Sequence, residues 1–146
     1  DTLKALYARS ALFFCNKEEA IRILALPAGT KIQELLTKLR ALGPEVVVIT
    51  DGPNGAYAHD GSQMFKVPMY PDQKSPYERT GAGDAFAATV AVAFALGKPL
   101  NEALLWGPIN AMSVVQYIGA QKGLLSREAL EHYLAHAPAD YRVESS

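Results

Sequence analysis

Two kinds of segment follow one another along the chain. Two short runs, Ala11–Cys15 and Val46–Thr50, are apolar almost throughout, which is typical of strands that are covered on both faces. Apolar residues at helical spacing follow Thr30, so we predict a helix that Thr30 caps and that Gly43-Pro44 ends. This alternation of strand and helix indicates an α/β protein.

The middle of the chain predicts a hairpin. The segments Ala56–His59 and Gln63–Val67 flank the turn-forming pair Asp60-Gly61, which is a strong hairpin signal. Turn-forming residues fill 51–55 before it, and Tyr70–Tyr77 after it contains two prolines and is expected to be a loop.

Helices are predicted for most of the rest. Short helices are expected at 2–8 and 17–26, long apolar helices at 81–97 and 100–118, and a last helix, capped by Ser126, that ends near His136. We therefore expect a single α/β domain over 1–146, with a layered fold in which helices flank a mostly parallel sheet and an antiparallel hairpin forms its edge.

Composition excludes several classes of protein. The 146 residues are 49% hydrophobic and 20% charged, as in an ordinary globular chain with a core. The formal net charge is -1 without a basic stripe, so no nucleic-acid partner is expected. The apolar run Ala85–Leu96 is shorter than the about 20 residues that cross a bilayer, so no membrane partner is expected. The single cysteine, Cys15, fits a reducing compartment, and we expect a cytoplasmic protein.

The segment Thr80–Phe86 carries the most specific chemistry. Its sequence, TGAGDAF, opens an apolar helix, and its glycines leave backbone N–H groups uncovered where a helix N-terminus attracts an anion such as phosphate. Asp84 in the first turn is suited to orient or deprotonate an attacking hydroxyl in phosphoryl transfer. A plain glycine turn before a helix explains the same residues, so spacing alone leaves both interpretations open.

The same segment resembles the signature of the PfkB or ribokinase-like carbohydrate kinases, which is written D-T-x-G-A-G-D-x-F. Three further motifs match that family in the right order. Asn16–Glu19 matches N-x-x-E, Thr50–Gly55 matches T-x-G-x-x-G, and Gly119-Ala120 matches the Gly-Ala pair that follows the penultimate helix. Four ordered motifs are more specific than any one of them, and they extend the resemblance over most of the chain.

The resemblance implies a ribokinase-like fold, present in part, and ATP-dependent phosphorylation of a hydroxyl on a sugar or a related small alcohol. Asp84 takes the position of the family's general base, which removes the proton from that hydroxyl. Gly81, Ala82 and Gly83 take the position of the anion hole, which holds the transferring phosphoryl group.

The other motifs imply nucleotide and metal contacts. Asn16 and Glu19 correspond to the pair that organises Mg²⁺ and the phosphates, with Glu19 as the metal residue; Mg²⁺ generally takes few carboxylates and keeps several waters. Thr50, Gly52 and Gly55 correspond to residues that line the phosphates and ribose, where glycines permit close approach of the backbone.

Two departures from the family pattern affect these assignments. The signature begins with Glu78-Arg79 in place of Asp-Thr, and that Asp often helps a monovalent-cation site, so the resemblance implies ATP and Mg²⁺ and leaves a monovalent cation open. A helix position that often holds a nucleotide-contacting Asn or His falls at Pro108, and Asn110 two residues later is the candidate contact.

Family members are longer than this chain, which starts at Asp1 without Met. Their sugar-binding residues and β-sheet lid lie mostly in the first half, so we expect this chain to be the C-terminal half, without that N-terminal region. The expected partners are a sugar or nucleoside-like substrate, and either a second copy in a homo-oligomer or the missing half. A catalytically silent nucleotide-binding fragment or module is the alternative.

Overall fold

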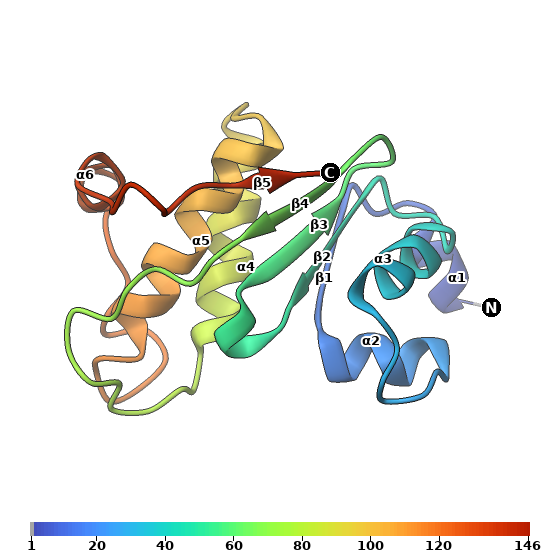
Figure 1. Cartoon of the computed structure of the whole chain (residues 1–146), viewed down its shortest axis with the longest axis horizontal. Helices are drawn as coiled ribbons and strands as arrows, with labels where there is room; N and C mark the ends of the chain where they lie inside the picture. Colours follow the sequence, from blue (N-terminus) through green and yellow to red (C-terminus); the bar gives the residue numbers. More distant parts are fainter. Residues whose placement is uncertain (1) are drawn as a thin grey trace. The chain divides into compact units, whose positions relative to one another are not determined.

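The computed structural model describes residues 2–146, which divide into two compact units (Figure 1). The first contains residues 2–66 together with Glu144–Ser146, and the second contains Val67–Val143. The residues of the N-x-x-E and T-x-G-x-x-G motifs therefore lie in the first unit, and those of the Gly81–Asp84 signature lie in the second.

The first unit is built on a five-stranded sheet with the order β1-β2-β3-β4-β5. The strands are β1 (Leu12–Asn16), β2 (Val46–Thr50), β3 (Ala56–His59), β4 (Met64–Val67), which ends where the second unit begins, and β5 (Glu144–Ser145). β1 and β2 are parallel, whereas β2 with β3 and β4 with β5 are antiparallel.

The α/β class is confirmed, but the sheet is mixed rather than mostly parallel. The reason lies in the connections. β1 reaches β2 through a long segment with two helices, which permits a parallel pair, whereas only a short turn separates β2 from β3. β5 was not predicted, because its two residues are exposed and carry no apolar pattern.

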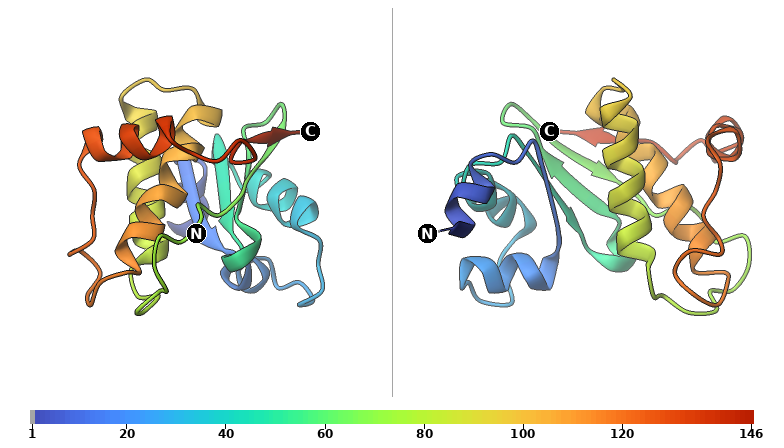
Figure 2. Two further views of the ribbon diagram at one scale, coloured as in Figure 1. Left: turned by 60° about the vertical axis from the view of Figure 1, so that its left-hand side comes forward. Right: turned by 180° about the vertical axis from the view of Figure 1, so that it is seen from behind.

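Helices α1 (Thr2–Tyr7), α2 (Lys17–Leu24) and α3 (Ile32–Arg40) complete the first unit. Figures 1 and 2 show α2 and α3 over one face of its sheet. The prediction that Thr30 caps α3 is wrong: Lys31 occupies the N-cap position, and the Thr30 hydroxyl donates to the Pro27 carbonyl at 2.7 Å. Threonine hydroxyls also close local turns, and here that alternative prevails.

A hydrophobic core joins these helices to the sheet. Its buried side chains come from α2, from one face of α3 and from β1 and β2, and the fully buried ones include Leu35, Leu36, Leu39, Val47 and Ile49. Since burial of each such side chain stabilises the fold by about 1.5–3 kcal/mol, this core holds the carboxyl ends of β1 and β2 in place.

The second unit is helical, with α4 (Ala82–Ala95), α5 (Leu100–Val114) and α6 (Arg127–Ala135). α4 and α5 run side by side in opposite directions (Figures 1 and 2). Close approach is possible at Gly107, where a Cβ would lie 2.6 Å from the Phe86 ring. The prediction that Ser126 caps α6 is confirmed, since its hydroxyl accepts the Ala129 N–H at 3.3 Å.

Among the helices of residues 2–146, none combines the length and the hydrophobicity that a membrane crossing requires.

Candidate functional site

The signature segment forms the start of α4. Gly81 is the N-cap residue and has φ +83°, a left-handed conformation that favours glycine. Its carbonyl accepts the first helical hydrogen bond from Ala85 N–H at 2.9 Å, and the Ala82 N–H donates to the Arg79 carbonyl at 3.3 Å. The sequence TGAGDAF therefore forms a glycine turn that leads directly into a helix.

The first turn of α4 leaves backbone donors free. Within residues 2–146, the N–H groups of Gly83 and Asp84 have no hydrogen-bond partner. Gly83 is exposed, and no atom lies within 4 Å of the place where its Cβ would be. Unpaired amides at the positive end of a helix dipole are suited to hold an anion.

Asp84 lies beside these amides. It is exposed in the first turn of α4 and, within the described residues, its carboxylate makes no hydrogen bond or ion pair. Its carboxylate is therefore free to accept a proton from a ligand that the amides hold.

In the first unit, Asn16 and Glu19 bind each other. Asn16 Oδ1 accepts the Glu19 N–H at 2.8 Å, and Glu19 Oε2 accepts the Asn16 N–H at 2.9 Å, which together form a capping box at the start of α2. The N-x-x-E motif thus has a structural role that the sequence alone could have indicated, because Asn and Glu at this spacing are typical of a helix start.

The register of the sheet brings the N-x-x-E and T-x-G-x-x-G motifs of the first unit together. Asn16 and Thr50 are Cα partners at the carboxyl ends of the parallel strands β1 and β2. Ligands of α/β proteins commonly bind at this end of parallel strands.

The turn after β2 is compact. Gly52 and Gly55 have φ values of +50° and +89°, and the Asp51 N–H donates to the Gly55 carbonyl at 2.9 Å. The Asp51 carboxylate stabilises the turn, since its Oδ2 accepts a hydrogen bond from Asn54 Nδ2 at 3.1 Å. The same oxygen forms an ion pair with Lys17 Nζ at 3.1 Å. The sequence pattern predicts a turn residue at Asp51 and gives no role to Lys17, although Asp51 directly follows one predicted strand and Lys17 comes two residues after the other.

Asn110 is buried and both ends of its amide are used. Its Nδ2 donates to Thr89 Oγ1 at 2.8 Å, and its Oδ1 accepts the Leu125 N–H at 3.0 Å. Thr89 in turn donates to the Ala85 carbonyl at 2.6 Å. Asn110 therefore links α5 to α4 and to the segment before α6.

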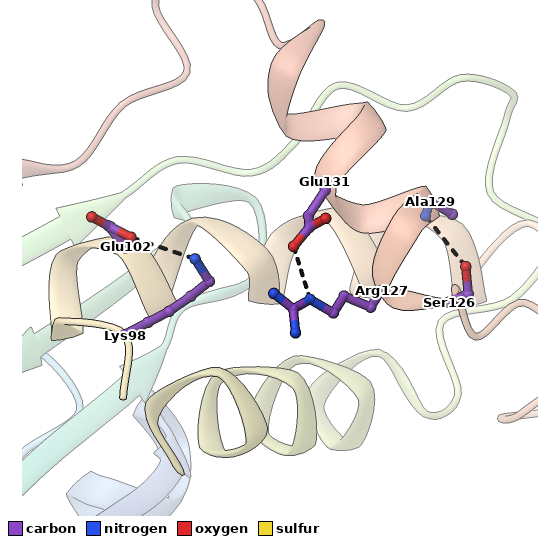
Figure 3. A network of polar contacts seen from close by, with 6 residues as sticks. All are labelled: Lys98, Glu102, Ser126, Arg127, Ala129 and Glu131. Carbon is purple, nitrogen blue, oxygen red and sulfur yellow. Dashed lines mark hydrogen bonds and ion pairs between the residues drawn. The ribbon is translucent and has the colours of Figure 1, made fainter. Parts of the chain in front are cut away.

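A cleft of about 280 Å³ lies beside Asn110 in the second unit. Its walls are mainly apolar, with Val92 of α4 and Trp106 of α5 among them, and Arg127 also lines it. Figure 3 shows Arg127 paired with Glu131 at 2.9 Å, and Lys98 with Glu102 at 3.5 Å. None of residues 81–84 lines this cleft.

Metal ligands are sparse. Within residues 2–146, no group of three or more His, Cys, Asp or Glu side chains is arranged to hold a metal ion. Glu19 is exposed, and its capping bond uses Oε2. One accessible carboxylate suits an ion such as Mg²⁺ that is held mostly by water and phosphate oxygens, so the residues present fit that ion.

Comparison with known proteins identifies the family. Residues 1–127 match the family described as pfkB family carbohydrate kinase. The chain belongs to this family. It is 36% identical over 100 residues to a ribokinase of Bacillus subtilis, and 30% identical over 121 residues to a cytidine kinase of Thermococcus kodakarensis.

A structural comparison supports the same assignment. The pfkB chain resembles Arabidopsis thaliana ribokinase, solved with ribose and ATP, with a TM-score of 0.82 and 27% identity over 90% of this chain. It covers only part of its relatives: 68% of this chain matches 33% of the B. subtilis ribokinase, 82% matches 42% of the cytidine kinase, and the structural match covers 43% of the plant enzyme. The chain thus spans less than half the length of these relatives.

Proposed function

We propose that the chain supplies the nucleotide-binding and phosphoryl-transfer part of an ATP-dependent kinase that acts on a hydroxyl of a sugar or nucleoside. Family membership and the relatives named ribokinase and cytidine kinase support this class of acceptor. The observation that carries the proposal is the start of α4, where the free amides of Gly83 and Asp84 adjoin the free Asp84 carboxylate.

Asp84 is the proposed general base. As the acceptor oxygen bonds to the γ-phosphorus, the bond from phosphorus to the leaving oxygen of ADP breaks, and Asp84 takes the proton of the acceptor hydroxyl. The segment Gly81, Ala82 and Gly83 is the proposed anion hole. Since the Ala82 N–H already donates to Arg79, the N–H groups of Gly83 and Asp84 are the donors with free capacity for the transferring group.

The first unit is proposed to hold the nucleotide. Thr50, Gly52 and Gly55 offer a compact turn at the end of β2, which Asn16 adjoins across the strand pair. Glu19 is the proposed Mg²⁺ residue, through waters, with the capping bond retained. When bound, Mg²⁺ neutralises charge on the phosphates.

A nucleotide contact by Asn110 stays a prediction. One N–H of its amide has no protein partner among residues 2–146, and this N–H is the group that remains for a ligand. A monovalent cation likewise stays open. The Glu78 oxygen Oε1 already accepts the Gly119 N–H at 3.1 Å.

We further propose that the chain is the C-terminal half of the kinase. The partial coverage of its relatives supports this assignment, with the sugar site largely in the other half. The same coverage favours a second candidate for this chain by itself, namely a module that binds nucleotide without turnover. Pairing with the other half or with a second copy, and a cytoplasmic location, belong to the same proposal.

A phosphorylation assay of the natural protein tests the proposal directly. ATP-dependent formation of a phosphate monoester is measured with pentoses, hexoses and nucleosides as acceptors, together with ADP release. We expect one acceptor class to be phosphorylated with one ADP formed per product. Binding of Mg-ATP without transfer to any acceptor would contradict the kinase proposal and support the silent module.

A further inference from the structure

The segment before α4 is hydrogen-bonded to the end of α5. The N–H groups of Tyr77 and Glu78 both donate to the carbonyl of Val115, at 2.7 and 3.3 Å. Val115 is the C-cap residue of α5, so its carbonyl is among those that a helix end leaves without a helical partner. Figures 1 and 2 show the two loops at the end of the unit where α4 begins.

A side chain makes a second connection. Glu78 Oε1 accepts the N–H of Gly119 at 3.1 Å, across a separation of 41 residues in sequence. Gly119 has φ +90°, which favours glycine at this point of the turn. A hydrogen bond with a charged acceptor is stronger than a neutral one, so Glu78 holds the 119–120 turn against the start of the signature segment.

Direct packing makes a third connection. A Cβ on Gly81 would lie 2.5 Å from Ala120 Cβ and 2.8 Å from Ala120 Cα. Backbone and side chain of Ala120 therefore contact the residue that begins α4. The Gly119-Ala120 motif, which had no role in the proposed chemistry, lies directly against the anion-binding turn.

We propose that Glu78, Val115, Gly119 and Ala120 form a clamp that sets the position of the free Gly83 and Asp84 amides. Glu78 acts in it as a positioning residue. The clamp grips residues 77, 78 and 81, and the two free amides follow within three residues. A donor displaced by about 1 Å stabilises the transferring phosphoryl group much less. This role rests on the proposed function.

The test compares three variants of the natural protein: Glu78→Ala, Glu78→Gln and the control Glu102→Ala. Glu102→Ala removes the same charge from an exposed carboxylate of the same unit, which pairs with Lys98. Glu78→Ala is expected to lower kcat by about tenfold to a hundredfold, with KM for ATP changed by less than about threefold, because the misplaced donors act mainly in the transition state.

Glu78→Gln retains an oxygen that accepts the Gly119 N–H, so its kcat is expected within about fivefold of the unmodified protein. The clamp is contradicted if Glu78→Gln is as slow as Glu78→Ala, if Glu78→Ala matches the Glu102 control, or if only KM changes.

Amide hydrogen exchange separates this inference from the proposed function. In Glu78→Ala, the Gly119 amide loses its acceptor and is expected to exchange at least about tenfold faster. The amides of residues 77 and 78 are also expected to exchange faster, because the adjoining connection is lost. Glu78→Gln should keep the slow rate. If the unmodified protein phosphorylates no acceptor, the proposed function fails. Unchanged exchange in Glu78→Ala overturns the clamp whether or not the protein is a kinase.

Discussion

Asn16 and Glu19 each satisfy a backbone N–H of the other, so a magnesium role for Glu19 has to coexist with a capping role. Glu19→Gln separates the magnesium role from the capping role, because the Gln side chain still accepts the Asn16 N–H but carries no charge. We expect unchanged unfolding free energy and about tenfold weaker binding of Mg-ATP, as for the loss of about 1.4 kcal/mol. Calorimetric titration measures the affinity.

Glu18→Gln is the matched control for Glu19. Glu18 is the exposed neighbour on the same helix and, within residues 2–146, its carboxylate makes no hydrogen bond or ion pair. Glu18→Gln should leave the unfolding free energy and the affinity for Mg-ATP unchanged. Equal losses of affinity in the two variants would mean that general charge, and not a metal contact, weakens binding.

Asn110 is buried between three elements, and its loss has a structural consequence. Asn110→Ala leaves the Leu125 N–H without an acceptor and removes a donor from Thr89. A buried group left without a partner costs about 1–3 kcal/mol, and we expect that decrease in the free energy of unfolding by urea. Asn101→Ala, at an exposed position of the same helix, should change it by less than about 0.5 kcal/mol. Equal effects in the two variants would contradict the packing role.

Cys15 is buried in the core of the first unit, and this burial raises the pKa of its thiol to about 12 from an ordinary 9.0. The folded state therefore keeps a proton that the unfolded state releases as pH rises above about 9, so this contribution to stability is lost with rising pH. We expect unfolding free energy to fall more steeply from pH 8 to 10 in the unmodified protein than in Cys15→Ala. Parallel pH profiles would contradict this.

At the scale of elements, the contact between α4 and α5 depends on Gly107. A Cβ there would lie 2.6 Å from Phe86 and 2.8 Å from Val90, and both side chains are buried. Overpacking costs about 1–3 kcal/mol, and the better helix propensity of Ala offsets up to about 1 kcal/mol. We expect Gly107→Ala to lower the unfolding free energy by about 1–2 kcal/mol.

Gly83→Ala is the contrasting helical glycine for that stability measurement. Its Cβ would meet no atom within 4 Å. The substitution should leave stability unchanged or raise it by up to about 1 kcal/mol. A stable Gly107→Ala variant would contradict the close approach of the two helices.

Sequence patterns predicted elements best where the signal is local. β2 and β3 have the predicted ends, because a continuous apolar run and a turn-bounded segment mark them. Strand direction depends on the connections between strands, and β5 depends on pairing with the distant β4, so neither follows from local hydrophobicity. The N-cap of α3 was misplaced since Thr30 had a competing turn partner.

At the scale of the whole molecule, the sequence motifs predicted the family, which the comparisons confirm. The sequence did not predict that the Arg79 carbonyl accepts the Ala82 N–H, that Asn110 hydrogen-bonds to Thr89 and Leu125, or that Lys17 pairs with Asp51. These contacts form between residues that folding brings together, and no motif spacing reports them. The division into two units is equally a property of long-range contacts.

The central claim is that Asp84 accepts a proton beside an anion held by the first turn of α4. The most direct measurement is phosphoryl transfer by Asp84→Asn in the natural protein, with Asp72→Asn in an exposed loop of the same unit as control. We predict that kcat falls by about a hundredfold or more, while ATP affinity and the Asp72 control stay unchanged. Undiminished kcat in Asp84→Asn would contradict the account.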